Sequence, residues 1–96
     1  MSTDAYTFSF RNGVDLGEVA QTLELAKVAA AGVWGEANVH LAVTHRLNQP
    51  HRQLTVKAAG AAGDAVVHIF TGLLLKEFGT RLFDVQRRTP ILPMSA

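Results

Sequence analysis

The stretch from Asp64 to Gly79 constrains the fold of this chain more than any other, because its apolar residues recur with the period of an α-helix. Asp64 suits the N-cap of a helix, and Gly79 suits the left-handed position just after one. The bulky apolar side chains share about half of a helical wheel. They are Val66, Val67, Ile69, Phe70, Leu73, Leu74 and Phe78. The stretch therefore predicts a helix over 64–79 with one face in the core.

The opposite face of this predicted helix lacks the charged residues of an ordinary solvated surface. It carries His68, Thr71, Gly72 and Leu75 at helical spacing. A glycine inside a helix costs about 1 kcal/mol relative to alanine, and small residues let another backbone approach closely. Three interpretations follow. The helix is buried on two sides within its own domain, or this face contacts another subunit, or His68 has a functional role.

An earlier helix with a similar property is predicted from Asp15 to about Ala31. Asp15 suits the N-cap, and Glu18 three residues later completes a capping-box pattern. Gly32 is a suitable end. Apolar residues nevertheless fall on the outer face, namely Leu25, Val28 and Ala29. Because two helices share this anomaly, the sequence favours a contact surface outside the core over isolated exposed side chains.

Runs of alternating apolar and polar residues predict four strands, over 6–11, 37–44, 53–58 and 81–87. The polar break at 48–51 makes the middle two a β-hairpin. The side chains expected to face the helices are Phe8, Phe10, Leu41, Val43, Leu54, Val56 and Val85. The other sheet face is expected to be small, polar and free of aromatic residues, with Thr7, Ser9, His40, Ala42, Thr44, Gln53, Thr55, Lys57, Leu82, Asp84 and Gln86. Aromatic residues on such a face are what stacks RNA bases, so nucleic-acid binding is not expected.

The predicted order β-α-β-β-α-β is typical of an α+β, ferredoxin-like two-layer sandwich, in which a four-stranded antiparallel sheet carries both helices on one face. Right-handed crossovers would place the first and third strands in the centre. Residues 1–88 are expected to form a single domain. Residues 89–96 contain two prolines and no periodicity, and we expect them to form a flexible C-terminal tail.

Composition excludes several classes of protein. The 96 residues suffice for one domain, and the formal charge of +1 implies no bulk attraction to nucleic acid or to acidic membranes. The chain has no cysteine, so disulfides and thiolate chemistry are excluded. No apolar run approaches the roughly 20 residues of a membrane span, and the first residues do not resemble a signal peptide. We therefore expect a soluble, cytoplasmic protein without membrane contact.

Basic residues gather at the predicted hairpin tip. They are His45, Arg46, His51 and Arg52, and we expect them to be exposed and mobile. Such a cluster can bind an anion or an acidic partner. A solvated edge that blocks edge-to-edge strand pairing is the alternative. Two histidines without a nearby carboxylate do not predict a metal site, and we expect neither a metal nor a cofactor.

The opening strand, the turn Asn12-Gly13-Val14-Asp15 and the following helix resemble the start of ACT-type amino-acid-sensing domains, which share the predicted strand order. The resemblance covers about a third of the chain. It departs from the family in lacking the proline-glycine turn typical of its members. It implies a regulatory domain whose small-ligand site lies between subunits near this turn.

No catalytic motif is spelled out, so the sequence favours a protein without enzymatic activity. The main hypothesis is a small self-associating interaction or accessory module, most simply a homodimer, with a possible further protein partner. Its contact would involve Leu25 and Val28 on the first helix and His68, Thr71, Gly72 and Leu75 on the second. The alternatives are the ACT-like sensing domain and a weak nucleic-acid or phosphate binder that uses the hairpin tip.

Overall fold

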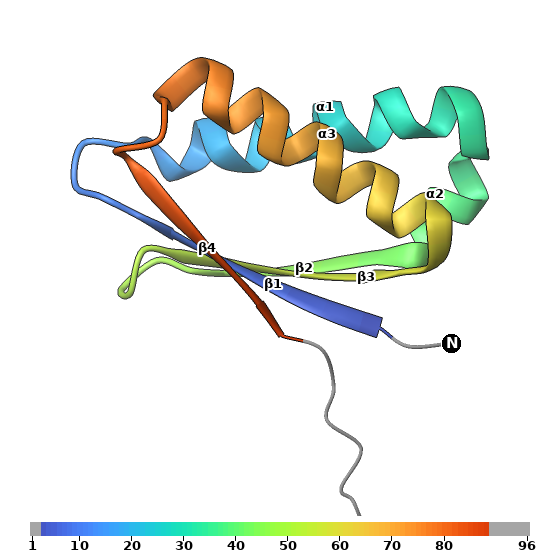
Figure 1. Ribbon diagram of the computed structural model, residues 1–96, viewed down its shortest axis with the longest axis horizontal. Coiled ribbons are helices and arrows are strands. Elements are labelled where there is room, and N and C mark those ends of the chain that lie inside the picture. Colours follow the sequence, from blue (N-terminus) through green and yellow to red (C-terminus); the bar gives the residue numbers. More distant parts are fainter. Residues whose placement is uncertain (1–2, 89–96) are drawn as a thin grey trace, which may run out of the picture.

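The computed structural model describes residues 3–88, which form four strands and three helices of an α+β fold. In chain order the elements are β1 (Thr3–Phe10), α1 (Leu16–Trp34), α2 (Glu36–Ala42), β2 (Val43–Asn48), β3 (Gln53–Ala59), α3 (Gly60–Phe78) and β4 (Phe83–Arg88). The helices form one layer and the sheet a second layer beneath it (Figure 1). The predicted tail, 89–96, lies outside the described residues.

The sheet has the strand order β2-β3-β1-β4, and each neighbouring pair is antiparallel. The first and third strands are therefore central, as expected. Phe8 on β1 pairs with Leu54 on β3 and with Val85 on β4, which sets the register. Phe8 is fully buried and its ring meets that of Phe70 on α3 edge to face, with centroids 4.9 Å apart. This contact joins the two layers at the centre of the core.

Most of the predicted core face is confirmed. The side chains that are buried as expected are Phe8, Phe10, Val43, Leu54 and Val56. The prediction was wrong for Leu41, which is 81% exposed on α2. Val85 has the expected register but remains 38% exposed, because β4 is an edge strand that α3 does not fully cover.

The outer sheet face follows the same register. The residues placed there as expected are Thr7, Ser9, Thr44, Gln53, Thr55, Lys57, Asp84 and Gln86. Three others were predicted wrongly, since His40 and Ala42 belong to α2 and Leu82 precedes β4. The register adds Arg46 and Arg88, which alternate with inward-facing neighbours on the two edge strands.

Helix α1 begins where the sequence predicts. The Asp15 carboxylate accepts from the backbone N–H of Gly17 at 2.8 Å and of Glu18 at 3.4 Å, which is an N-cap. The helix does not end at Gly32 but continues to Trp34. Gly35, with a positive φ of 87°, ends it instead. Trp34 is 40% exposed there.

The short helix α2 replaces the predicted start of the second strand. Its Val39 is buried, whereas its Leu41 points to solvent. The Asn38 side chain donates to the carbonyl oxygen of Trp34 at 2.7 Å, which satisfies an acceptor that the end of α1 leaves free. Over so short a stretch, the apolar pattern of 37–43 fits the period of a helix as well as that of a strand. The junction with α1 favours the helix.

Helix α3 begins at Gly60, four residues before the predicted N-cap. A Cβ atom on Gly63 would lie 3.0 Å from the carbonyl carbon of Ala58, so any larger residue would have to push the first turn of α3 slightly away from β3. Asp64 therefore lies within the helix. The segment 60–63, predicted as a connection, is its first turn.

Candidate functional site

Helix α1 exposes a continuous row of apolar residues, which we call the α1 stripe. Leu25 is 58% exposed, Val28 is 69% exposed and Val33 is 80% exposed. Ala29 and Gly32 lie between them at helical spacing, and both are exposed. Single exposed leucines are normal on a protein surface, whereas these residues follow one another along one face of the helix.

Gly32 has no role in packing within its own chain. A Cβ atom at this position would meet no other atom within 4 Å, and neither would one on Gly72 of α3. Each glycine sits in a helix without a positive φ, where it costs about 1 kcal/mol relative to alanine. At Gly32 the absent side chain leaves a shallow gap in the α1 stripe beside Val28.

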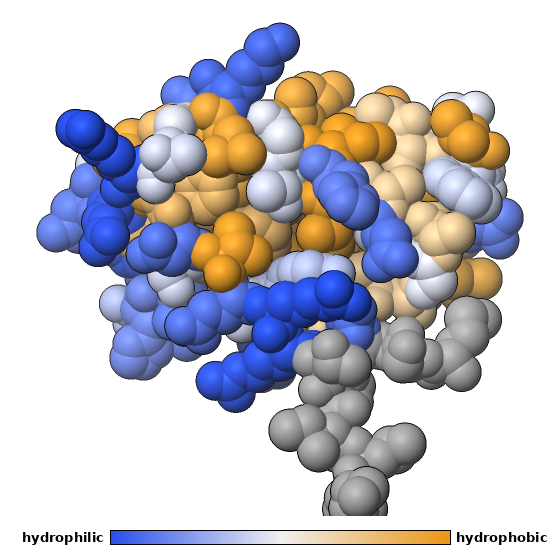
Figure 2. Space-filling model, in the orientation of Figure 1, coloured by the Kyte–Doolittle hydropathy of each residue, from blue (hydrophilic) through white to orange (hydrophobic). Residues whose placement is uncertain are grey.

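Two of the residues that the sequence singles out on α3 lie on a different flank. His68 and Thr71 line a crevice between α3 and β4, together with Val67 and Val85. Val28, in contrast, lines a depression between α1 and α2. Figure 2 shows the α3 side, where apolar residues gather mainly over the helix layer and hydrophilic residues over the sheet. His68 and Thr71 therefore line a different depression from Val28. Leu75 is 44% exposed.

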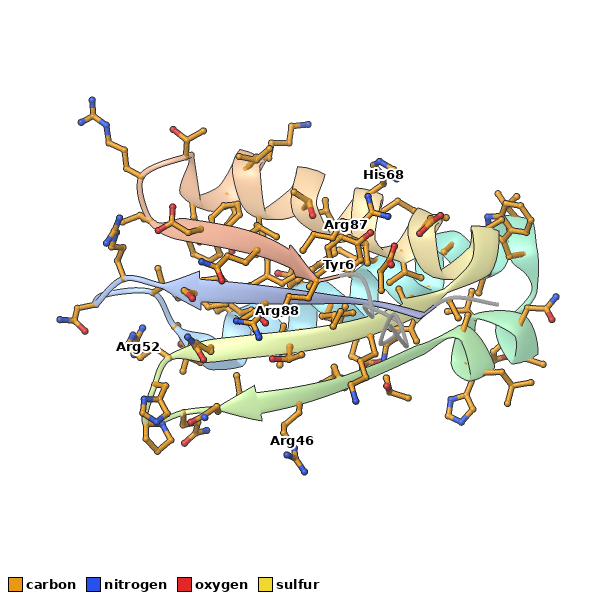
Figure 3. The ribbon with its side chains drawn as sticks, turned by 60° about the horizontal axis from the view of Figure 1, so that its bottom comes forward. Tyr6, Arg46, Arg52, His68, Arg87 and Arg88 are labelled. Carbon is orange, nitrogen blue, oxygen red and sulfur yellow. The ribbon has the colours of Figure 1, made fainter. Side chains whose placement is uncertain are left out.

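The α3–β4 crevice has a charged wall. Arg87 donates to the buried carboxylate of Asp4 at 2.5 Å, and its guanidinium carbon lies 5.7 Å from the centre of the Tyr6 ring. The hydrogen bond to Asp4, and then the charge of Asp4, raise the pKa of Arg87. His68 contacts the carbonyl oxygen of Asp64 at 3.1 Å through Nδ1. Figure 3 labels Tyr6, Arg87 and His68 on this side. The polar groups of Arg87, Asp4 and His68 therefore find their partners within the chain. These contacts stabilise the edge of the fold.

The hairpin tip contains one structural arginine. Arg52 is half-buried rather than exposed, and it adopts a positive φ of 51°. Its guanidinium donates to the carbonyl oxygen of Arg11 at 3.1 Å and also to that of Val14. Both carbonyls belong to the turn between β1 and α1, which the ACT-type resemblance proposes as a ligand site. The expectation of an exposed and mobile Arg52 was therefore wrong.

The other residues of the predicted basic cluster make different contacts. His45 faces α1, where its Nδ1 lies 3.5 Å from Nζ of Lys27. His51 lies in the turn, and its backbone N–H donates to Asn48 at 3.3 Å. Arg46 is exposed on the outer sheet face (Figure 3). Two of the four residues, His45 and Arg46, line one depression together with Thr44, Thr55 and Lys57.

Metal chemistry finds no support in the part of the chain that the structure describes. Within residues 3–88 no three His, Asp or Glu side chains gather closely enough to hold an ion. None of the described helices combines the length and hydrophobicity that a membrane crossing requires.

Comparisons with known proteins yield no relative. No family model, no curated protein and no solved structure matches the chain. The resemblance to ACT-type domains remains a prediction.

Proposed function

We propose that this protein is a small self-associating interaction module and that two copies pair through the α1 stripe. The observation that carries the proposal is the exposure of Leu25, Val28 and Val33 along one helix, beside a glycine that its own fold does not need. A second copy is the simplest occupant, because the stripe is complementary to itself.

Self-complementarity follows from the order of residues along α1. When two copies of the helix run antiparallel about a point between Val28 and Ala29, Leu25 of each copy lies opposite Gly32 of the other. Val28 then lies opposite Ala29. A two-fold interface contains each of these contacts twice, and Leu25 and Val28 each meet a smaller residue, as ridges into grooves require. Val33 lies opposite Glu24 in this register.

The expected strength is modest. Complete burial of a leucine or valine contributes roughly 1.5–3 kcal/mol, and the pair of stripes offers Leu25 and Val28 twice. Association costs about 4–15 kcal/mol, which is of similar size. A single helix face also covers less than the roughly 800 Å² per partner of a typical stable interface. We therefore propose a weak dimer that forms at high protein concentration.

The test is molar mass by light scattering across a dilution series, with two matched variants. Gly32→Glu and Gly72→Glu both replace an exposed helix glycine in open space with a charged helix former. Both should fold at least as stably as the natural chain. We expect Gly32→Glu to be monomeric throughout and Gly72→Glu to associate like the natural chain.

Two results would contradict the proposal. A natural chain that stays monomeric at high micromolar concentration would exclude self-association. Dissociation by Gly72→Glu or Leu75→Glu, but not by Gly32→Glu, would place the contact on α3, where the sequence analysis located half of it.

We further propose that the architecture is ferredoxin-like, with α2 inserted between α1 and β2. The support is the order β2-β3-β1-β4 with antiparallel neighbours and with helices on one face. In such an arrangement the outer sheet face is not covered by the chain's own helices.

A further inference from the structure

Charge is divided unequally between the two layers of the fold. Among residues 3–88 only one acidic side chain, Asp84, lies on the outer sheet face. The exposed acidic residues of the helix layer and its cap are Asp15, Glu18, Glu24, Glu36, Asp64 and Glu77. The small net charge of +1 therefore conceals a basic face and an acidic face.

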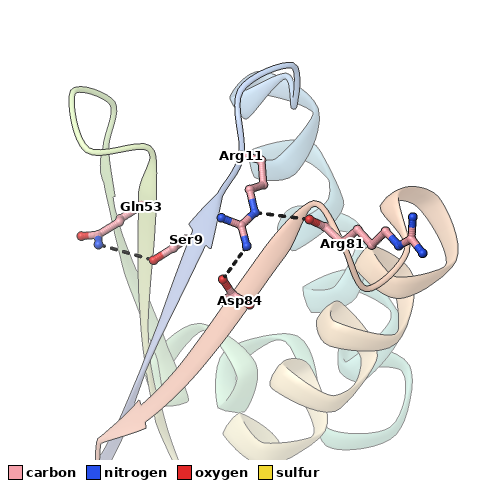
Figure 4. A network of polar contacts seen from close by, with 5 residues as sticks. All are labelled: Ser9, Arg11, Gln53, Arg81 and Asp84. Carbon is pink, nitrogen blue, oxygen red and sulfur yellow. Dashed lines mark hydrogen bonds and ion pairs between the residues drawn. The ribbon is translucent and has the colours of Figure 1, made fainter.

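Three cations occupy the outer face, and we call them the cationic face: Arg46, Lys57 and Arg88. All three are exposed, and within residues 3–88 none of them forms an ion pair. Asp84 does not offset them, because Arg11 lies 3.5 Å from its carboxylate (Figure 4). The face thus carries uncompensated positive charge on β2, β3 and β4.

The register gives the cations a definite arrangement. Ala5 on β1 pairs with Lys57 on one side and with Arg88 on the other. Neighbouring strands lie about 4.8 Å apart, so the two cations stand roughly 10 Å apart across a small side chain. Arg46 pairs with Thr55 one row further along, and both line a shallow depression with Lys57 and Thr44. Figure 3 shows Arg46 and Arg88 on this face.

We propose that the cationic face binds the phosphate backbone of single-stranded nucleic acid without reading its sequence. Arg46, Lys57 and Arg88 would contact phosphates, and the hydroxyls of Thr44 and Thr55 would donate to phosphate or sugar oxygens. The face lies across the sheet from the α1 stripe, so the proposal is independent of self-association.

The chemistry of the face favours this occupant over an acidic protein. Protein interfaces are centred on aromatic or other large apolar anchors, and the outward positions of the described strands contain none. Sequence reading in a duplex is not expected, because a flat sheet presents no helix or ribbon that enters a groove. The face has no aromatic residues, so base stacking is not expected. Phosphate contacts do not need aromatic residues, but binding without stacking is weak.

The test is fluorescence anisotropy of a labelled oligothymidylate about 20 nucleotides long, measured over a salt series. Three phosphate contacts predict a slope of log K against log salt near −2. Lys57→Gln should reduce the slope by about 0.7 and weaken binding several-fold at low salt. Lys76→Gln removes the same charge from the helix layer and should change neither quantity. A third variant tests location by gain of affinity, since Thr7→Tyr adds a stacking ring at the centre of the face and should tighten binding at least several-fold.

Three outcomes would overturn the proposal. No salt-dependent binding at low ionic strength would exclude it. If Lys57→Gln and Lys76→Gln weakened binding equally, the oligonucleotide would be attracted to the net charge of the protein rather than to the cationic face. Competition by polyglutamate as effective as that by oligothymidylate, with no gain from Thr7→Tyr, would identify an acidic protein surface as the partner.

Discussion

Arg52 in the β2–β3 turn holds the loop that follows β1, because its Nη2 donates to the carbonyl oxygen of Arg11 at 3.1 Å. A backbone bond from the N–H of Phe10 to the carbonyl oxygen of Arg52, at 2.9 Å, closes the same junction. Two segments far apart in the chain therefore meet at the point where β1 leads into α1. Arg52 of the hairpin tip therefore has a structural role, because it fixes the loop that leads into α1.

We expect Arg52→Ser to destabilise the fold by about 1–2 kcal/mol, since hydrogen bonds to a charged group are lost. Arg46→Ser, at an exposed position of the same hairpin, should change stability by less than about 0.5 kcal/mol. Arg52→Gly removes the same guanidinium but relieves the positive φ, so its stability should fall between those of Arg52→Ser and the natural chain. Urea denaturation measures all three. A serine variant as stable as the natural chain would show that the guanidinium contributes nothing.

Two helix glycines should respond oppositely to alanine. Gly63→Ala places a Cβ atom 3.0 Å from the backbone of Ala58 and should destabilise by about 1–3 kcal/mol, as overpacking does. Gly72→Ala meets open space and should stabilise by roughly 0.5–1 kcal/mol through helix propensity. Thermal unfolding of both variants checks this contrast. If both substitutions changed stability in the same direction, α3 would not pack on β3 in this way.

Helix α2 can be tested with one buried and one exposed residue. Val39→Gln should cost about 2 kcal/mol or more, because it places a polar group in the core without a partner. Leu41→Gln should change stability by less than about 0.5 kcal/mol, because Leu41 is 81% exposed. A strand over 37–44 would instead direct both side chains inward. Comparable losses of stability from both substitutions would therefore support the strand.

The ion pair at the sheet edge predicts a difference between adjacent arginines. Arg87→Met leaves the buried carboxylate of Asp4 without its partner, which is costly. Arg88→Met removes an exposed charge that has no ion pair among the described residues. We expect a clearly lower denaturation midpoint for Arg87→Met than for Arg88→Met. Adding Asp4→Asn to the Arg87 variant should restore part of the lost stability. If it does not, the unpaired charge of Asp4 is not the cause of the loss.

The sequence by itself determined the features that depend on local periodicity. The alternation of Phe8 and Phe10 with polar neighbours sets the inner face of β1, because a one-residue slip would expose the aromatic rings. The apolar stripe of α3 and the Asp15 cap of α1 are likewise local, since side-chain spacing and a nearby carboxylate decide them. The exposure of Leu25 and Val28 is the same kind of inference, and the structure agrees with it.

Only the tertiary structure decided the features that join distant segments. Helix α2 replaces a strand because Asn38 reaches the end of α1, and α3 starts early because Gly63 packs on Ala58. The positions of Lys57 and Arg88 on either side of Ala5 depend on pairing between strands far apart in the chain. Short apolar runs fit either period, and sequence spacing carries no information on which distant residue a side chain will meet. The choice between helix and strand, and the choice of distant partner, depend on which complete packing of the chain has the lowest free energy.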